Sequence, residues 1–278
     1  MKPSLGLALV LVAVALANAR GETPAPQKSP ADQAALDQKI RSATAAIEQN
    51  PADKGAYLSR ANLYISAGDA ERAIVDYDRV LKLDPQWAAA YDERGSLHFT
   101  LGQINESIDD FDRYLKLKPQ QEPWHWKRGI SYYYAGRWDD GRRQFEGYQT
   151  VDDNDVENAV WRYLCMARGQ GVAQARDALL KIKQDGRVPM MEVYALYGGK
   201  ARPEDVLAAV QAGSPTAGAL NARLFYAHLY LGLYYETAGD RELAKKHITS
   251  ATTHKIGHYM WNVADVHAKL LAGSATKP

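Results

Sequence analysis

The chain has 278 residues, 46% of them hydrophobic and 24% charged, which is the composition of a folded protein and excludes a disordered one. Its formal net charge of +1 gives no electrostatic reason to expect a nucleic acid or an anionic membrane as partner. The single cysteine, Cys165, excludes an internal disulfide, so the fold has to be stabilised by packing.

The first segment predicts export. Lys2 precedes an apolar run over residues 5–16, and Ala17-Asn18-Ala19 is a small-x-small cleavage site. Residues 1–19 are therefore predicted to be a signal peptide, with the mature chain beginning near Arg20; the alternative is a retained membrane anchor. No cysteine lies near this site to accept a lipid, so we expect a periplasmic or secreted protein without a lipid anchor.

The next residues lead into the folded region. Residues 20–31 are rich in proline and are predicted to be a flexible leader. Residues 32–49 carry apolar side chains at helical spacing, and Pro51 follows them, so a helix is expected there. This helix is predicted to cover the start of the repeats that follow.

The stretch 54–155 consists of three copies of one 34-residue unit, at about 54–87, 88–121 and 122–155. The residues that match at this spacing are Tyr57, Tyr91 and His125; Arg60, Arg94 and Arg128; Ala61, Gly95 and Gly129; Gly68, Gly102 and Gly136; and Tyr77, Phe111 and Phe145. A unit of this length with this punctuation resembles the tetratricopeptide repeat, a pair of helices that buries its apolar face only by stacking on a neighbour.

Each copy predicts two helices and their ends. In the first copy, Gly68 can end one helix in a left-handed conformation, Asp69 can cap the next, and Pro85 prevents its continuation. The small residues at the position of Ala61 are expected to permit a close approach of the two helices. The acidic turn before residue 156 lacks the glycine and glutamate of an EF-hand, so Asp155 is predicted to be a helix cap rather than a calcium ligand.

The repeats become irregular after residue 155. A divergent pair is predicted at 156–185, with Ala175, Ala178, Leu179 and Ile182 on its second helix. An irregular segment at 186–219 is expected to hold short helices at about 190–197 and 203–212. A last repeat at 220–253, a capping helix at 258–271 and a tail at 273–278 complete the chain. The sequence thus predicts an all-α tetratricopeptide-repeat α-solenoid over residues 32–272.

We find no catalytic motif, and we predict no catalytic residue, cofactor or metal. Cys165 lies in an apolar helix and is read as a buried thiol, with a catalytic thiol as the alternative. His254 and His258, with His247 nearby, could share a metal, but polar surface at a turn is the favoured interpretation. Asn105 matches a glycosylation acceptor, and helix capping is preferred there.

The first helices of stacked pairs line the concave face, where a partner peptide would bind. Helical phase places the candidate partner-binding residues of this groove at Asn62, Asp92, Glu93, Ser96, Trp126, Lys127 and Tyr133. Aromatic rings beside a few charges suit a peptide groove. The alternative, which the pattern does not separate, is that these rings pack against a neighbouring helix or a second subunit.

Two stretches, Trp126–Arg137 with Trp161–Leu164, and Tyr230–Asp240 with the helix after it, look more specifically like the NlpI family of bacterial lipoproteins. This resemblance implies a homodimeric adaptor of the cell envelope, which brings a protease to cell-wall hydrolases. The lipid-bearing cysteine of that family is missing here. The clamp by which other tetratricopeptide domains hold chaperone C-termini is incomplete, because Leu58, Glu93 and Pro123 occupy clamp positions beside Asn62.

Our leading hypothesis from the sequence is therefore a non-enzymatic scaffold that binds proteins or peptides of the cell envelope, and not nucleic acid. A structural module that forms homo-oligomers is the first alternative. The second is a hydrolase that uses Cys165 or the C-terminal histidines.

Overall fold

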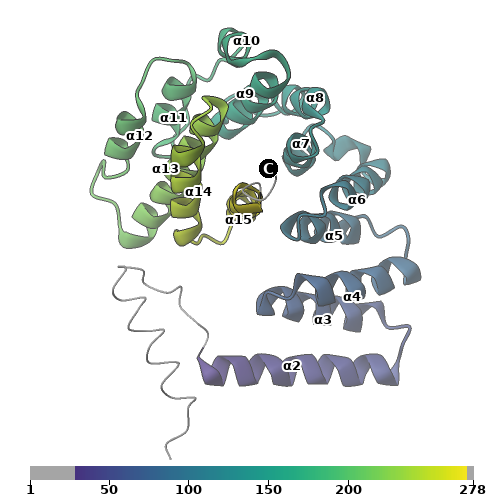
Figure 1. The fold of residues 1–278 in the computed structure, drawn as a ribbon. Helices are drawn as coiled ribbons and strands as arrows, with labels where there is room; N and C mark the ends of the chain where they lie inside the picture. The colour runs from purple at the N-terminus through teal and green to yellow at the C-terminus, as the bar shows by residue number, and fades with distance from the viewer. Residues whose placement is uncertain (1–28, 274–278) are drawn as a thin grey trace, which may run out of the picture. The chain divides into compact units, whose positions relative to one another are not determined.

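The fold is seen in a computed structural model that describes residues 29–273, and those residues contain helices and no β-strand (Figure 1). Contacts divide the chain into two units, Met1–Gln38 and Lys39–Pro278, with helix α2 (Pro30–Gln49) crossing the boundary. All later helices lie in the second unit. The predicted signal peptide, and most of the predicted leader and tail, lie outside the described residues.

The three regular repeats fold as three helix pairs. Their bounds are α3 (Lys54–Ala67) and α4 (Ala70–Leu83), α5 (Ala88–Thr100) and α6 (Ile104–Leu117), and α7 (Trp126–Tyr134) and α8 (Trp138–Tyr148), with a 3-10 turn η1 (Pro119–Gln121) before α7. At α6 the predicted cap is wrong, because Gln103 and not Asn105 is the N-cap residue and no side chain caps that helix. The helix ends of the first pair follow the sequence as predicted. Gly68 has a φ of +80° and ends α3, while the carboxylate of Asp69 accepts a hydrogen bond from the backbone N–H of Arg72 and caps α4.

The small residues of the first helices allow close approach, as predicted. A Cβ atom added to Gly95 would lie 2.8 Å from Cε1 of Phe111, and one added to Gly129 would lie 2.7 Å from Cζ of Phe145. Both rings are fully buried. The recurrent glycine therefore makes room for the recurrent ring sixteen residues later, and the two helices of a pair pack ring against backbone.

Arginines on the first helices of successive pairs form a row, and each bonds to its own pair and to the element before it. Arg94 of α5 donates to Asp110 of its own pair at 2.8 and 2.6 Å, and to Asp78 of the preceding pair at 2.5 Å. Each partner lies sixteen residues from the arginine, one on either side. The same spacing recurs for Arg60 with Asp76 and Thr44, for Arg128 with Gln144 and Asp112, and for Arg162 with the carbonyl oxygen of Ala178 and with Glu146.

This arginine row marks α9 (Val156–Gln170) as the first helix of a fourth pair, and Asp155 caps it by accepting from the N–H of Glu157, as predicted. Its second helix is shorter than we expected: α10 (Val172–Asp177) ends before Ala178, Leu179 and Ile182. The reason is a tertiary contact, because a side chain from the next helix makes the hydrogen bonds to the backbone that a continued helix would otherwise make. The hydroxyl of Tyr194 donates to the carbonyl of Leu180 at 3.0 Å and accepts from the N–H of Ile182.

The remaining helices are α11 (Met190–Tyr197), α12 (Pro203–Ala209), α13 (Ala217–Thr237), α14 (Arg241–Thr253) and α15 (Tyr259–Gly273). Helices α13 and α14 form a long pair in which Gly232 lies against Ile248. The short helices α11 and α12 pack on α9 and α13 and fill the place of a further regular pair.

The C-terminal helix α15 packs on α14, and it also lies on the face of the first helices, beside α5 and α7 (Figure 1). The ring of Tyr259 is 5.4 Å from Phe99 of α5 and 5.4 Å from Trp126 of α7, between centroids. Further along α15, Nδ1 of His267 is 3.0 Å from the hydroxyl of Tyr134. A helix that we expected as a terminal cap thus covers part of the predicted partner groove.

Candidate functional site

The groove residues predicted from the sequence separate into an open part and a covered part. Asn62 of α3 and Glu93 of α5 are exposed, and Ile65, one turn after Asn62, keeps 38% of its surface accessible. This open part carries one apolar side chain between polar neighbours.

Asp92, Ser96 and Lys127 form a hydrogen-bonded network beside it. The Lys127 ammonium donates to Asp92 at 2.8 Å and to the hydroxyl of Ser96 at 3.2 Å. Nε2 of His125 donates to the second oxygen of Asp92 at 3.0 Å, since its Nδ1 accepts from the N–H of Arg128. Although burial opposes it, this hydrogen bond and the charge of Lys127 hold the pKa of Asp92 below its ordinary value. The network therefore holds the carboxylate of Asp92 on α5 and the ammonium of Lys127 on α7 in fixed positions.

Trp126 and Tyr133 take different places. Trp126 packs edge-on against Tyr259 and stacks on His258 at 5.9 Å, so its ring already has a partner within this chain. Tyr133 is only 6% exposed, and its ring lies edge-on to Trp161 at 5.4 Å. A buried ring cannot contact a partner while α7 keeps this packing, so Tyr133 is a core residue and not an accessible anchor.

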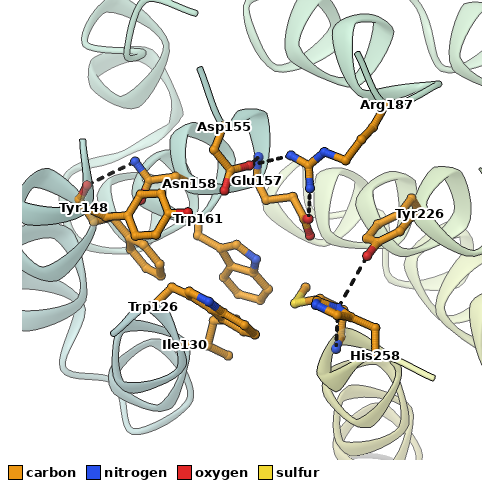
Figure 2. A pocket seen from close by; sticks show the side chains of 12 residues that line it. Trp126, Ile130, Tyr148, Asp155, Glu157, Asn158, Trp161, Arg187, Tyr226 and His258 are labelled. Carbon is orange, nitrogen blue, oxygen red and sulfur yellow. Dashed lines mark hydrogen bonds and ion pairs between the residues drawn. The ribbon is translucent and has the colours of Figure 1, made fainter. Parts of the chain in front are cut away.

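A pocket of about 220 Å³ lies next to the covered part, between α7, α8, α9, α13 and the residues that begin α15 (Figure 2). Its aromatic walls are Trp126, Tyr148, Trp161 and Tyr226. One predicted groove residue, Trp126, thus belongs to a second site that the sequence did not reveal.

A charged cluster forms one side of this pocket. The guanidinium of Arg187 contacts Glu157 and Asp155 at 2.5 Å each (Figure 2). It also contacts Asp185 at 2.6 Å. Burial raises the pKa of Glu157 to about 7, even though Arg187 favours its charged form. The hydroxyl of Tyr230 donates to the other oxygen of Glu157 at 2.6 Å. Three carboxylates around one guanidinium leave the cluster with an excess of negative charge.

Two buried polar atoms of the pocket lack a hydrogen-bond partner among the described residues: Oδ1 of Asn158 and Nε1 of Trp161. Their side chains are 3% and 2% exposed. The amide nitrogen of Asn158 is bonded to the carbonyl of Phe145 at 3.1 Å, which fixes the amide and leaves its oxygen to accept. In Figure 2 the indole nitrogen of Trp161 lies on the side toward Glu157 and Arg187. Unpaired buried donors and acceptors are costly, so a bound group is expected to satisfy them.

The sequence contained little that could have located this pocket. Its residues come from repeats that diverge from the consensus and from the irregular segment that carries Arg187. The one usable signal was the phase of Trp126, which placed that residue on the inner face of α7.

Three further histidines and the cysteine lie outside this pocket. His228 and His247 are 2.9 Å apart between Nδ1 atoms, and His254 stacks on His228. Residues 29–273 contain no group of three histidine, cysteine or acidic side chains arranged to hold a metal. Cys165 is 1% exposed, and burial raises the pKa of its thiol. The described part of the chain also has no helix with the length and apolarity needed to cross a membrane.

This architecture is an all-α tetratricopeptide-repeat solenoid, and the comparisons agree. Residues 61–125 match the family profile described as tetratricopeptide repeat. No curated protein matches the sequence significantly.

Solved structures show the same fold. A tetratricopeptide repeat protein from Parabacteroides merdae is 15% identical, with a TM-score of 0.54 over 87% of this chain and 94% of that one. The C-terminal part of a TPR repeat-containing protein from Cytophaga hutchinsonii is 13% identical, with a TM-score of 0.50 over 82% and 94%. At these identities the likeness concerns the fold alone.

Proposed function

We propose that this protein is a non-enzymatic scaffold that binds other proteins through the face of its first helices. The observation that supports the proposal is that this face already holds a helix, because Tyr259 of α15 packs between Phe99 and Trp126. A surface that accepts an amphipathic helix of its own chain has the shape and chemistry to accept one from a partner. The open part, with Asn62, Ile65 and Glu93, is the surface left for it.

Binding would combine one apolar anchor with polar neighbours that set register. Ile65 is the exposed apolar side chain of this face, and Glu93 gives it negative charge, whereas Asp92 is paired with Lys127. A complementary partner segment would place an apolar residue on α3 and basic residues on α5. Trp126 and Lys127 would contribute only to a partner that displaces α15 or extends beside it.

Two single substitutions test this surface. Ile65→Asp should abolish capture of partners from an envelope extract, because it places a charge at the apolar centre of the interface. Val75→Asp is the matched control, since Val75 of the second helix α4 is 57% exposed and carries the same change on another face. Both variants should keep wild-type helicity. Capture that survives Ile65→Asp, or that Val75→Asp removes equally, would exclude this face as the binding site.

We further propose that the scaffold works in the bacterial cell envelope, as the resemblance to the NlpI family implies, with a protease or cell-wall hydrolases as candidate partners. The proposal rests on the apolar run 5–16 and the site Ala17-Asn18-Ala19, which lie outside the described residues. Expression of the full chain in a bacterium, followed by fractionation and N-terminal sequencing, tests it. A mature protein that begins near Arg20 in the periplasm is expected, and a full-length cytoplasmic product would contradict it.

Self-association is a second candidate function, favoured by one observation. Trp138 and Leu270 keep 37% and 52% of their surfaces exposed, and both border a hollow of about 240 Å³ between α8 and α15. Exposed large apolar side chains gathered at one place are typical of an interface. Sedimentation of the purified protein at high micromolar concentration should show a dimer that Trp138→Ala dissociates, and a monomeric wild type would exclude this candidate.

A further inference from the structure

The pocket beside α15 is built to hold something, because its groups are incompletely paired. Nε1 of Trp161 is a donor and Oδ1 of Asn158 is an acceptor, and neither of these two atoms has a hydrogen-bond partner among the described residues. A ligand that satisfies both must itself carry an acceptor and a donor. A backbone peptide group carries both.

The charge of the pocket determines whether a cationic or an anionic ligand is favoured. Asp155 and Glu157 of the lining, and Asp185 behind them, share the single guanidinium of Arg187. Negative charge remains uncompensated even though the pKa of Glu157, about 7, leaves that carboxyl only partly ionised at neutral pH. His258 does not compensate it, because burial, and then the charge of Arg187, lowers its pKa and keeps it neutral near pH 7. A cation is therefore favoured over an anion or a neutral group.

The aromatic walls of the pocket also favour a cationic ligand, through a second kind of interaction. The indole rings of Trp126 and Trp161 and the phenol rings of Tyr148 and Tyr226 surround the space (Figure 2). Aromatic faces attract an ammonium or guanidinium group, and they also cover its aliphatic stem. A volume of about 220 Å³ holds roughly seven waters, which is room for one long side chain and not for a helix.

We propose that this pocket binds the cationic side chain of one lysine or arginine in an extended segment of a partner. The charged end contacts Glu157 and Asp155, the stem lies between the indoles, and the peptide group of the same residue pairs with Trp161 and Asn158. The inference rests on the proposed scaffold function, because it takes the residue to come from a partner protein. It adds the chemistry of that partner: a basic residue in addition to the apolar contact made on the open part of the groove.

The probe is an acetylated and amidated pentapeptide, Ser-Gly-Lys-Gly-Ser, together with its arginine and norleucine versions. The full chain is labelled with ¹⁵N, and the indole N–H resonance of Trp161 is assigned by its loss in Trp161→Phe. The lysine or the arginine peptide should shift this resonance saturably and bind at least tenfold more tightly than norleucine, which keeps the stem and lacks the charge. A resonance that no peptide moves, so that water alone satisfies these atoms, or equal shifts with norleucine, would overturn the proposal.

Two variants refine the test. Glu157→Gln should weaken binding of the basic peptide at least tenfold and leave the norleucine peptide unchanged. Glu204→Gln is the matched control, because Glu204 of α12 is exposed and lies outside the pocket. If Glu157→Gln does not fold, the comparison of peptides on the wild-type chain decides alone. This assay contains no partner protein. If the peptides fail to bind while partner capture is intact, only the proposal for the pocket is refuted. If the peptides bind while Ile65→Asp leaves partner capture unchanged, only the proposal for the open part of the groove is refuted.

Discussion

Replacing Gly129 with alanine measures how tightly a repeat is packed. The new Cβ would lie 2.7 Å from Cζ of Phe145 and 3.0 Å from Cε1 and Cε2, where ordinary contact begins at 3.4 Å. The ring is 0% exposed, so it can yield only by displacing its neighbours or by shifting toward the pocket that it lines. Overpacking costs about 1–3 kcal/mol, and alanine returns about 1 kcal/mol through its helix propensity. We therefore expect the free energy of unfolding to fall by roughly 1 kcal/mol.

A second substitution, at Phe145, should reverse the sign of this change in the free energy of unfolding. Phe145→Leu removes the three ring atoms that the new Cβ would meet, so in that background Gly129→Ala should stabilise the protein by about 1 kcal/mol. Urea unfolding followed by circular dichroism measures both steps. Gly147→Ala is the control, because its Cβ meets nothing within 4 Å and the change should stabilise slightly in either background. Equal effects of Gly129→Ala with phenylalanine and with leucine at position 145 would refute the packing argument.

Three further predictions concern charge, pH and the thiol. Arg94→Met should lower the free energy of unfolding in urea by about 3–5 kcal/mol, because Asp110 is 4% exposed and loses its buried partner; a loss near zero would contradict it. Burial, then the neighbouring His247, lowers the pKa of His228 to about 4, so protonation favours the unfolded chain. Stability should fall as pH drops from about 6.5 toward 4, by up to about 1.4 kcal/mol per unit, and thermal melts of His228→Gln should show a weaker slope, an unchanged slope being the opposing result. Cys165 should react with a thiol reagent only as fast as the protein unfolds, and rapid labelling of the native state would favour the hydrolase alternative.

The repeats could be predicted from the sequence because their determinants are local and periodic. Gly68, Asp69 and Gly129 each act on a helix end or a helix contact within one unit, so a 34-residue period exposes them. The arginine row was also within reach, since Asp76 and Asp110 share the period of Arg60 and Arg94.

The covered groove and the pocket could not be predicted in the same way. The phase of a helix predicts that Trp126 and Tyr133 share a side of α7 that is not solvent, but it does not say which segment covers them. Tyr259 comes from more than 100 residues further along the chain. Arg187 lies in a segment without periodicity, and the end of α10 depends on Tyr194, which reaches back from the next helix. Such contacts between distant, irregular segments leave no pattern in one sequence.

The arginine row has a consequence for how such a protein can grow or shrink. Each arginine takes one partner from its own unit and one from the unit or helix before it, so every unit completes its predecessor. Arg94 takes an acid on both sides, while Arg60 and Arg128 each take one acid and one neutral side chain at this spacing. A duplication of 34 residues carries a full set of partners and can be accommodated anywhere in the row. An insertion of any other length would separate an arginine from its partner in the preceding unit, such as Asp78 or Asp112. The row ends at Arg162, whose forward partner is the backbone carbonyl of Ala178 and no longer a side chain, and beyond it the chain does not follow the 34-residue period.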